Sequence, residues 1–350
     1  MNRDTLISGI SRVAPALSKK DLVPILSCLC FSPNGVLTAY DDIVAMQTKF
    51  DLGVVGGIRG QMLIDFLNST SSKDIEIVAG DKEVSFKSGE SKLKAPVLPV
   101  DDFVFEVPSI EGSVELGMAP VVIDCFETAS VSLGVDPGHA WRLGVTILLD
   151  EDKLVFFSSD GFSGTRVELE CEGLGAYRGR AVILPPRFCE LFIEVGKKDP
   201  PKVMNIAKEW VVVEFESGLK LFSRTVGEGE VKNYTESFNE SERQGKSQNP
   251  QPVPGAFDMA LNRSLVVVGT QPDKVVQFVI QKGSMEITAE SPYGKSRDVI
   301  EFKDHADITV KSHPDLLKAC LKEVDKISFS KIGVYMEGPG FIRLVRVLNN

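Results

Sequence analysis

The chain has 350 residues, of which 43% are hydrophobic and 25% are charged, and its formal net charge is −10 at pH 7. These values are typical of a globular protein, and the length favours two or three domains over one. The negative charge, taken alone, argues against a protein that coats nucleic acid by bulk attraction. No apolar stretch reaches the roughly 18 residues of a membrane-spanning helix, and the N-terminal residues lack the features of a signal peptide. We therefore expect a cytoplasmic protein without a membrane partner.

The first third of the chain predicts a helix, strands, a second helix and further strands, in that order. Apolar residues at helical spacing indicate a helix over residues 3–17. Alternating apolar residues then indicate strands over 25–34 and 35–42. A second helix is expected over 60–72, and hairpin strands are expected over 74–98, where glycine-containing turns separate the apolar runs.

The same order of elements returns in the middle third and in the last third. The middle third predicts helices over 119–133 and 185–198, with strands over 141–152, 153–161 and 202–226. The last third predicts helices over 255–269 and 313–326, with strands over 274–283, 283–291 and 326–348. Because self-similarity along a chain is the signature of a repeat architecture, three copies of one unit are expected.

One short pattern marks the three copies, a strand that ends in a small polar residue and a carboxylate. The carboxylates are Asp41, Asp160 and Glu290. The longer second interval is explained by a polar, proline-rich segment without periodicity over 239–255, which predicts a domain boundary. We therefore predict an α+β protein of three repeated domains, with a linker. The predicted limits are 1–118 for the first domain, 119–244 for the second, 245–254 for the linker and 255–350 for the third.

Several motifs resemble those of the bacterial-type DNA polymerase sliding clamp, the β subunit of DNA polymerase III. They are Pro24-Ile25-Leu26, LTAYDD at 37–42, LPVDDF at 98–103, Ser159-Asp160-Gly161 and SRTVGEGEVKNY at 223–234. Their order and spacing coincide with the three repeats, so the resemblance covers the whole chain. The loose agreement fits a divergent member of the kind that a phage or plasmid encodes.

The resemblance implies three clamp domains per chain, each with helices on an inner face and antiparallel sheets outside. Two chains are expected to close head to tail into a homodimeric ring around double-stranded DNA. The ring implied is a non-catalytic processivity factor without a cofactor, which tethers a DNA polymerase and is placed on DNA by a clamp loader. Strands at the two ends of the chain leave sheet edges that pairing with a second copy would cover.

A ring that slides has to attract the phosphate backbone without reading bases, so its inner helices should be less acidic than the rest. The six expected helical segments together carry a small net positive charge, although the whole chain is acidic. Each cation taken singly is equally explained by an ordinary solvated helix face, and only their sum favours DNA. The candidate DNA-facing residues are Arg3, Arg12, Lys19, Lys20, Lys73, Arg187, Lys197, Lys198, Arg263, Lys318, Lys322 and Lys326.

The resemblance also implies a pocket between domains 2 and 3, into which partners insert a short hydrophobic peptide motif. Its candidate residues are Leu143, Ser159, Gly161, Phe162, Arg166, Val345, Val347 and Leu348. The aliphatic ones are equally explained as core positions of strands. In the family a basic–aliphatic pair directly follows the aspartate and glycine. Here FSGT intervenes before Arg166, so either Phe162 or Arg166 takes that position.

Catalytic and metal-binding patterns are weak in this sequence. His139, His305 and His313 stand in no metal-ligand spacing, and the glycine-rich segment 53–60 lacks the lysine of a phosphate-binding loop. The six cysteines lie mostly among apolar neighbours, which favours buried free thiols over a metal or redox pair. We therefore expect no catalytic residue, no metal and no cofactor. The alternative to the DNA-encircling ring is a three-repeat scaffold that binds proteins without closing around DNA.

Overall fold

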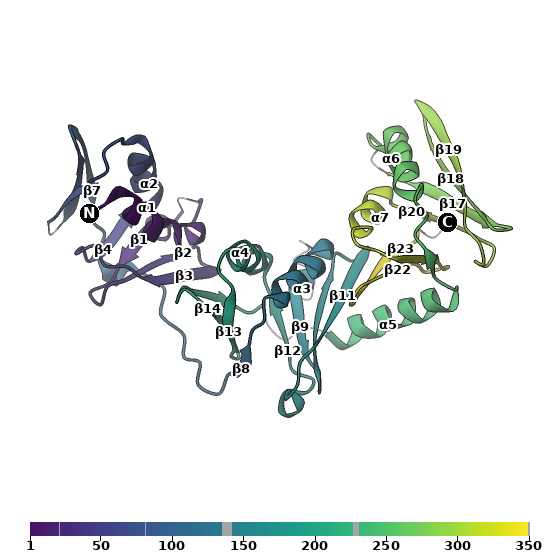
Figure 1. Ribbon diagram of the computed structural model, residues 1–350, viewed down its shortest axis with the longest axis horizontal. Helices are drawn as coiled ribbons and strands as arrows, with labels where there is room; N and C mark the ends of the chain where they lie inside the picture. The colour runs from purple at the N-terminus through teal and green to yellow at the C-terminus, as the bar shows by residue number, and fades with distance from the viewer. Residues whose placement is uncertain (21, 81, 135–141, 227–230, 272, 349–350) are drawn as a thin grey trace. The chain divides into compact units, whose positions relative to one another are not determined.

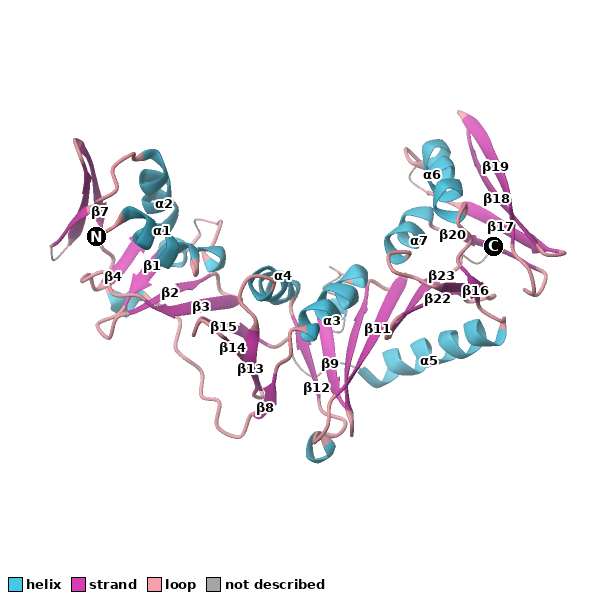
Figure 2. Cartoon of the chain, viewed as in Figure 1, coloured by secondary structure: helices cyan, strands magenta, loops and turns pink. Residues whose placement is uncertain are grey.

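A computed structural model describes residues 1–20, 22–80, 82–134, 142–226, 231–271 and 273–348. His139 and the middle of the motif at 223–234 lie outside these residues. The chain divides into two compact units, which are unit 1 (Met1–Ile123 and Arg187–Thr225) and unit 2 (Asp124–Pro186 and Val226–Asn350). Each unit holds one eight-stranded antiparallel sheet and one smaller sheet (Figures 1 and 2). The predicted α+β class with antiparallel sheets is confirmed.

Unit 1 contains the strands of the first third and part of the middle third. Its large sheet has the order β4-β1-β2-β3-β15-β14-β13-β8, and its small sheet has the order β5-β6-β7. The strands are β1 (Cys28–Phe31), β2 (Val36–Tyr40), β3 (Val44–Lys49), β4 (Gly56–Arg59), β5 (Glu76–Ala79), β6 (Glu83–Ser88), β7 (Ser91–Pro96), β8 (Val114–Gly117), β13 (Pro201–Ile206), β14 (Trp210–Phe215) and β15 (Lys220–Arg224). The helices are α1 (Arg3–Ser11), α2 (Gly60–Ser69) and most of α4 (Pro186–Gly196).

Unit 2 contains the rest of the middle third and the whole last third. Its large sheet has the order β12-β9-β10-β11-β23-β22-β21-β16, and its small sheet has the order β19-β18-β17-β20. The strands are β9 (Val145–Leu149), β10 (Lys153–Ser159), β11 (Ser163–Glu170), β12 (Ala181–Leu184), β16 (Gln251–Pro252), β17 (Val276–Gln281), β18 (Ser284–Ser291), β19 (Gly294–Glu301), β20 (Ile308–Ser312), β21 (Lys326–Phe329), β22 (Gly333–Gly338) and β23 (Phe341–Arg346). The helices are α5 (Val231–Ser247), α6 (Phe257–Val268), α7 (Pro314–Cys320) and most of α3 (Val121–Ala129).

The three thirds share one order of elements, and we name them repeat 1 (α1 to β7), repeat 2 (α3 to β15) and repeat 3 (α6 to β23). Each begins with a helix, continues with four strands and a second helix, and ends with three strands. Each large sheet is shared, because a strand of one repeat pairs with the last strand of the next. These joints are β3 with β15 and β11 with β23, both antiparallel. The limits predicted for the domains stay predictions.

The first helix is shorter than the sequence pattern predicted. Asn2 caps it, since its side-chain oxygen accepts hydrogen bonds from the backbone N–H groups of Asp4 and Thr5, at 2.9 and 3.2 Å. The helix ends at Ser11, and a short 3₁₀ turn with Pro15 in its first positions follows over Ala14–Ala16. Proline has no N–H to donate within a helix, so the expected continuation to residue 17 is wrong.

The strand ends that mark the repeats form capped turns. Oδ1 of Asp41 accepts hydrogen bonds from the backbone N–H groups two and three residues further on, at 3.1 and 2.9 Å, and Oδ1 of Asp160 does the same at 2.8 and 2.5 Å. In repeat 3 the capping position belongs to Ser291, whose hydroxyl accepts from the N–H two residues on, at 3.2 Å. The expectation that Glu290 is the third equivalent is therefore wrong, because it lies one residue earlier and pairs with Lys295 at 2.6 Å.

The first half of the segment 239–255, which was expected to lack periodicity, is helical, whereas only the first three residues of the predicted linker 245–254 belong to that helix. Residues 239–247 form the second half of α5, which packs against β21, β22 and β23 (Figure 2). Phe238 is buried in a cluster with Phe157 and Tyr335, and a Cβ atom on Gly245 would lie 2.3 Å from Tyr335. The helix was missed because its exposed described positions are almost all polar, so that the described part shows little apolar periodicity besides Phe238 and Gly245.

None of the described helices is long and apolar enough to span a membrane. The described residues also include no cluster of three or more histidine, cysteine, aspartate or glutamate side chains able to hold a metal ion. Burial raises the pKa of the Cys30, Cys125 and Cys320 thiols to about 11, so these thiols are protonated and unreactive at neutral pH.

His305 makes the stability of repeat 3 depend on pH. Its Nδ1 bonds the carbonyl oxygen of Ala306 at 2.8 Å, and its Nε2 accepts from the backbone N–H of Phe329 at 3.0 Å. Burial lowers the pKa of this imidazole below its ordinary value. When the pH falls below about 6.5, the unfolded chain takes up a proton that the folded chain resists, and stability is lost.

We therefore predict that the His305→Gln variant loses less thermal stability than the wild type between pH 7.5 and 5.5. Differential scanning calorimetry at the two pH values measures this difference in unfolding temperature. An equal loss of stability in His305→Gln and the wild type would refute the prediction.

Candidate functional site

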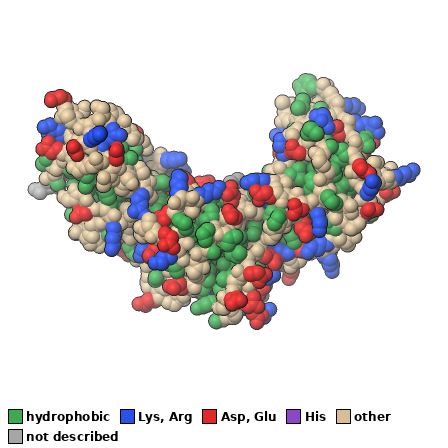
Figure 3. Space-filling model, in the orientation of Figure 1, with side chains coloured by type: hydrophobic (Ala, Val, Ile, Leu, Met, Phe, Trp, Pro, Cys, Tyr) green, Lys and Arg blue, Asp and Glu red, His purple; other side chains and the backbone are tan. Residues whose placement is uncertain are grey.

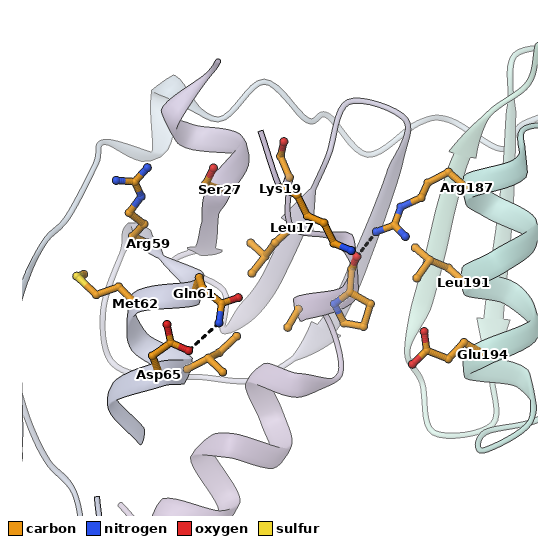
Figure 4. A pocket seen from close by; sticks show the side chains of 14 residues that line it. Leu17, Lys19, Ser27, Arg59, Gln61, Met62, Asp65, Arg187, Leu191 and Glu194 are labelled. Carbon is orange, nitrogen blue, oxygen red and sulfur yellow. Dashed lines mark hydrogen bonds between the residues drawn. The ribbon is translucent and has the colours of Figure 1, made fainter. Parts of the chain in front are cut away.

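A groove in unit 1 lies among the helical segments of repeats 1 and 2 and has a volume of about 910 Å³ (Figure 4). The 3₁₀ turn, the start of α2 and the exposed side of α4 form its walls. Lys19, Arg59 and Arg187 line it together with the carboxylates of Asp65 and Glu194, so its charge is slightly positive. The remaining lining residues are Ala14, Pro15, Leu17, Ser18, Ser27, Gln61, Met62, Ile64 and Leu191.

The cations that line this groove are not equally available. Nε of Arg187 donates to Oδ2 of Asp41 at 2.9 Å, and another guanidinium N–H donates to the carbonyl oxygen of Pro15. The Asp41 side chain is only 10% exposed, so Arg187 neutralises a buried carboxylate and ties repeat 2 to the turn of repeat 1. Lys19 by contrast is exposed, and no described residue forms an ion pair with it.

Most of the other predicted DNA-facing cations have partners within the protein. The arginines bind oxygen atoms: Arg3 donates to the carbonyl of Thr70 at 2.6 Å, Arg12 to that of Ser217 at 3.3 Å, and Arg263 to Asp298 with two nitrogens. The lysines with partners are Lys198 with Glu194, Lys318 with Asn262, and Lys322 with Glu127. Lys197 is exposed at the end of α4.

Lys20, Lys73 and Lys326 are exposed, and among the residues that the structure describes none forms an ion pair with them. On the face shown in Figure 3, basic and acidic side chains are interspersed. This arrangement can hold a polyanion only weakly, because paired cations have to break an existing contact before they bind phosphate.

The predicted partner pocket is centred on the turn between β10 and β11. The side chain of Phe162 is 53% exposed, and its ring stands edge-on to the His313 ring with centroids 6.2 Å apart. The carbonyl oxygen of Phe162 accepts from the backbone N–H of Arg346, at 2.7 Å. The turn of repeat 2 is thus fixed to the end of repeat 3, and an aromatic ring projects from the joint.

Ser159 and Gly161 shape this turn. The Ser159 hydroxyl donates to the carbonyl of Ser163 at 2.6 Å and accepts from the N–H of Gly161 at 3.1 Å. Gly161 has a φ of 89°, and a Cβ atom on it would lie 2.9 Å from the guanidinium carbon of Arg142. The positive φ favours glycine here, because other residues rarely adopt this backbone conformation.

The aliphatic members of the predicted set differ in exposure. Val345 and Val347 are 0% and 4% exposed and belong to the core of repeat 3. Leu348 is half-buried and is held by a bond from its N–H to the carbonyl of Lys311, at 2.8 Å. Leu143 is also half-buried. Phe162, Leu348 and Leu143 therefore offer apolar surface, whereas the two valines only support the strand beneath.

The structure places Arg166 away from this turn. Its guanidinium bonds Glu242 of α5 at 2.7 Å and Asn239 at 3.0 Å, and it lies 5.3 Å from the Phe238 ring centroid. Phe162 and Arg166 were the two candidates for the family's position after the aspartate and glycine. Phe162 lies at the turn, whereas Arg166 contacts α5. His313 and Arg142, which also flank the turn, were not in the predicted set. Only the repeat pattern could have found them, because neither stands in a recognisable motif.

Loss of Arg187 is expected to destabilise unit 1. The Arg187→Ala variant leaves the nearly buried Asp41 carboxylate without its cation, which should cost roughly 1–3 kcal/mol. Lys198→Ala, two residues after the end of the same helix, is the control, because its partner Glu194 is exposed and the pair contributes little. Urea unfolding followed by tryptophan fluorescence measures both, and equal midpoints for the two variants would contradict the prediction.

Comparison with solved structures finds the same fold over the whole chain. A DNA polymerase sliding clamp from Pseudomonas aeruginosa has a TM-score of 0.85 and 15% sequence identity, with 100% of this chain and 99% of that chain covered. The beta subunit from the DNA polymerase of Streptococcus pyogenes has a TM-score of 0.84 and 17% identity, with 100% and 99% covered. The DNA polymerase III beta subunit from Thermotoga maritima has a TM-score of 0.81 and 17% identity, with 100% and 98% covered.

Sequence comparison alone finds no matching family model and no matching curated protein. The fold of the chain is therefore that of the DNA polymerase sliding clamps, as the motifs predicted, while the sequence has diverged far from theirs.

Proposed function

We propose that the protein is a DNA polymerase processivity factor, a non-catalytic ring of two chains that encircles duplex DNA. The observation that carries the proposal is the similarity of fold to sliding clamps over the entire length of both chains. Three repeats per chain support it, because the order of elements leaves each chain with two complementary strand edges.

These two edges follow from the joints within the chain. β3 of repeat 1 pairs with β15 of repeat 2, and β11 of repeat 2 pairs with β23 of repeat 3. The strand of repeat 3 that is equivalent to β3 and β11 is β19, and the strand of repeat 1 that is equivalent to β15 and β23 is β7. Each of them is the outermost strand of its sheet. Pairing of β19 with β7 of a second copy would satisfy both edges, and two such joints close a head-to-tail dimer.

The contact with DNA is loose and independent of base sequence. The predicted DNA-facing cations lie on or beside helices of all three repeats, and many already have partners in the protein. Enclosure then holds the duplex and attraction to phosphate plays a minor part, which reconciles a net charge of −10 with a DNA partner.

The turn around Phe162 is proposed to receive peptide motifs of the DNA polymerase and the clamp loader. The turn that carries the exposed Phe162 ring contacts Arg346 and Arg142, and half-buried Leu348 and Leu143 lie close to these arginines in the chain. An exposed aromatic ring with aliphatic side chains near it is the kind of surface that takes a short hydrophobic anchor. Arg166 has no part in this pocket, since its guanidinium is engaged with α5.

A ring around DNA should stay bound to circular DNA for longer than to linear DNA. Protein that has been placed on DNA by its clamp loader should remain on nicked circular DNA during gel filtration. It should be lost from the same DNA after linearisation, because it slides off free ends. Native mass spectrometry should give the mass of two chains. Equal loss from both DNA forms, with the mass of a single chain, would favour the three-repeat protein-binding scaffold.

Replacement of Phe162 should weaken partner binding without opening the ring. The Phe162→Asp variant places a carboxylate where an apolar anchor is to be buried, and at least a tenfold loss of affinity for the replicative polymerase is expected. Ile43→Asp is the matched control, since Ile43 occupies the equivalent turn of repeat 1 and is 44% exposed. Surface plasmon resonance measures the affinities, and equal binding by both variants would exclude Phe162 from the pocket.

A further inference from the structure

The two joints within the chain predict how the free sheet edges of two chains would pair. This inference rests on the ring proposed above. The last strands of the repeats, β7, β15 and β23, can be aligned by one hydrogen bond each. In each repeat, the residue directly after the last strand donates its backbone N–H to a carbonyl oxygen. That carbonyl belongs to the residue directly before the second-last strand. These bonds are Val97 to Lys82 (3.0 Å), Thr225 to Glu209 (2.9 Å) and Val347 to Ile332 (3.4 Å). Pro96, Arg224 and Arg346 are therefore equivalent.

The opposite strands of the joints are aligned by their capped turns. Asp41, Asp160 and Ser291 cap equivalent turns, so Ile43, Phe162 and Tyr293 occupy equivalent positions two residues further on. In the two joints within the chain, the carbonyl of this residue accepts from the arginine at the end of the last strand. The bonds are Arg224 to Ile43 at 3.4 Å and Arg346 to Phe162 at 2.7 Å.

The same bond cannot form between two chains. The carbonyl of Tyr293 would face Pro96 of the other chain, and proline has no N–H. Because the N–H of Val97 points toward β6, the nitrogen of Pro96 points toward the free edge. The joint between chains thus lacks its last backbone bond, and Tyr293 remains 87% exposed in the single chain.

The alignment also sets the side chains that face each other. Val44 pairs with Ser223 and Ser163 pairs with Val345 within the chain, and the corresponding pair between chains is Gly294 with Ala95. Continuing along both strands, Lys295 faces Lys94 and Arg297 faces Lys92. The equivalent positions within the chain pair Ala45 with Phe222, Gln47 with Lys220, Gly164 with Leu344, and Arg166 with Ile342, and none of these pairs brings like charges together.

We propose that the chains join through β7 and β19 in this register, with two pairs of facing cations and a proline that removes the final ladder bond. The joint between chains is then the weakest of the three kinds of joint. Like charges directly opposite each other on a sheet are destabilising. Three of these four cations have a carboxylate one strand further away, since Glu83 pairs with Lys94 at 2.9 Å, Glu290 with Lys295 at 2.6 Å and Glu286 with Arg297 at 2.8 Å. These carboxylates reduce the repulsion without removing it.

A charge reversal on β7 tests the proposal. Lys92 faces Arg297 of the other chain in this register, and it also lies opposite Lys87 on β6, so Lys92→Glu does not harm its own hairpin. The dimer dissociation constant should fall by roughly threefold to tenfold at low salt, and the gain should shrink at high salt. Lys208→Glu makes the same change of charge on an exposed turn of unit 1 and should leave the constant unchanged. A dimer that is weaker, or no tighter than with Lys208→Glu, would overturn the proposal.

Disulfide trapping tests the register itself. Leu93 and Ser296 face each other in the proposed joint, so the double variant Leu93→Cys, Ser296→Cys should form a covalent dimer under mild oxidation. The variant Ser91→Cys, Ser296→Cys places the cysteines two residues out of register, beyond the reach of a disulfide, and should stay uncrosslinked. The reverse result would overturn the register.

The proposed function and this inference can fail separately. If the wild-type protein has the mass of one chain at all concentrations, both the proposed ring and the proposed register are wrong. If the wild type is a dimer that stays on circular DNA, and the cysteine pairs or Lys92→Glu give the contrary result, only the register is wrong.

Discussion

The unsatisfied backbone edge of a β-sheet is the constraint on which the whole structure depends. Each repeat ends one of its sheets in a strand whose N–H and C=O groups need partners, and the next repeat supplies them through β3 with β15 and through β11 with β23. Neither large sheet belongs to a single repeat, because each contains strands of two repeats. The positions of the exposed turns, the aromatic ring of Phe162 and the two remaining free edges all follow from this pairing.

The connections between repeats strengthen the joints by covering one face of each shared sheet. In unit 1 the ring of Phe105 packs on Tyr40 and Phe222, with centroids 5.1 and 5.3 Å apart. In unit 2 the ring of Phe238 on α5 packs edge-on to Phe157 at 5.6 Å, and Arg166 adds an ion pair to the same helix. One aromatic side chain from the connection therefore contacts each joint. The free edges β7 and β19 belong to the first and last repeats and have no such connection beyond them.

The sequence predicted the order of elements well, because each element has a local periodicity of apolar residues and the same order occurs three times. Helix α4 is typical: its apolar residues recur at helical spacing, and Phe188 and Phe192 are fully buried. Long-range contacts were not predictable in this way. Nothing local distinguishes Arg187, which neutralises a carboxylate 146 residues earlier, from an arginine free to meet DNA. The position of Glu290 was assigned one residue out of register because residue type suggested a carboxylate, whereas the hydrogen bond that defines the turn needs only an oxygen, which Ser291 supplies.

The distribution of charge argues for a function that depends on shape more than on affinity. Cations such as Arg263 and Lys198 are held by carboxylates of the same chain, so few phosphate contacts are available and a duplex would be bound weakly at any one position. Weak binding at each position is what a protein needs if it is to move along DNA, provided that something else prevents escape. In the ring proposed above, closure of two chains would supply that restraint. In that proposal the joint between chains is weaker than the joints within a chain, because its facing side chains carry like charges.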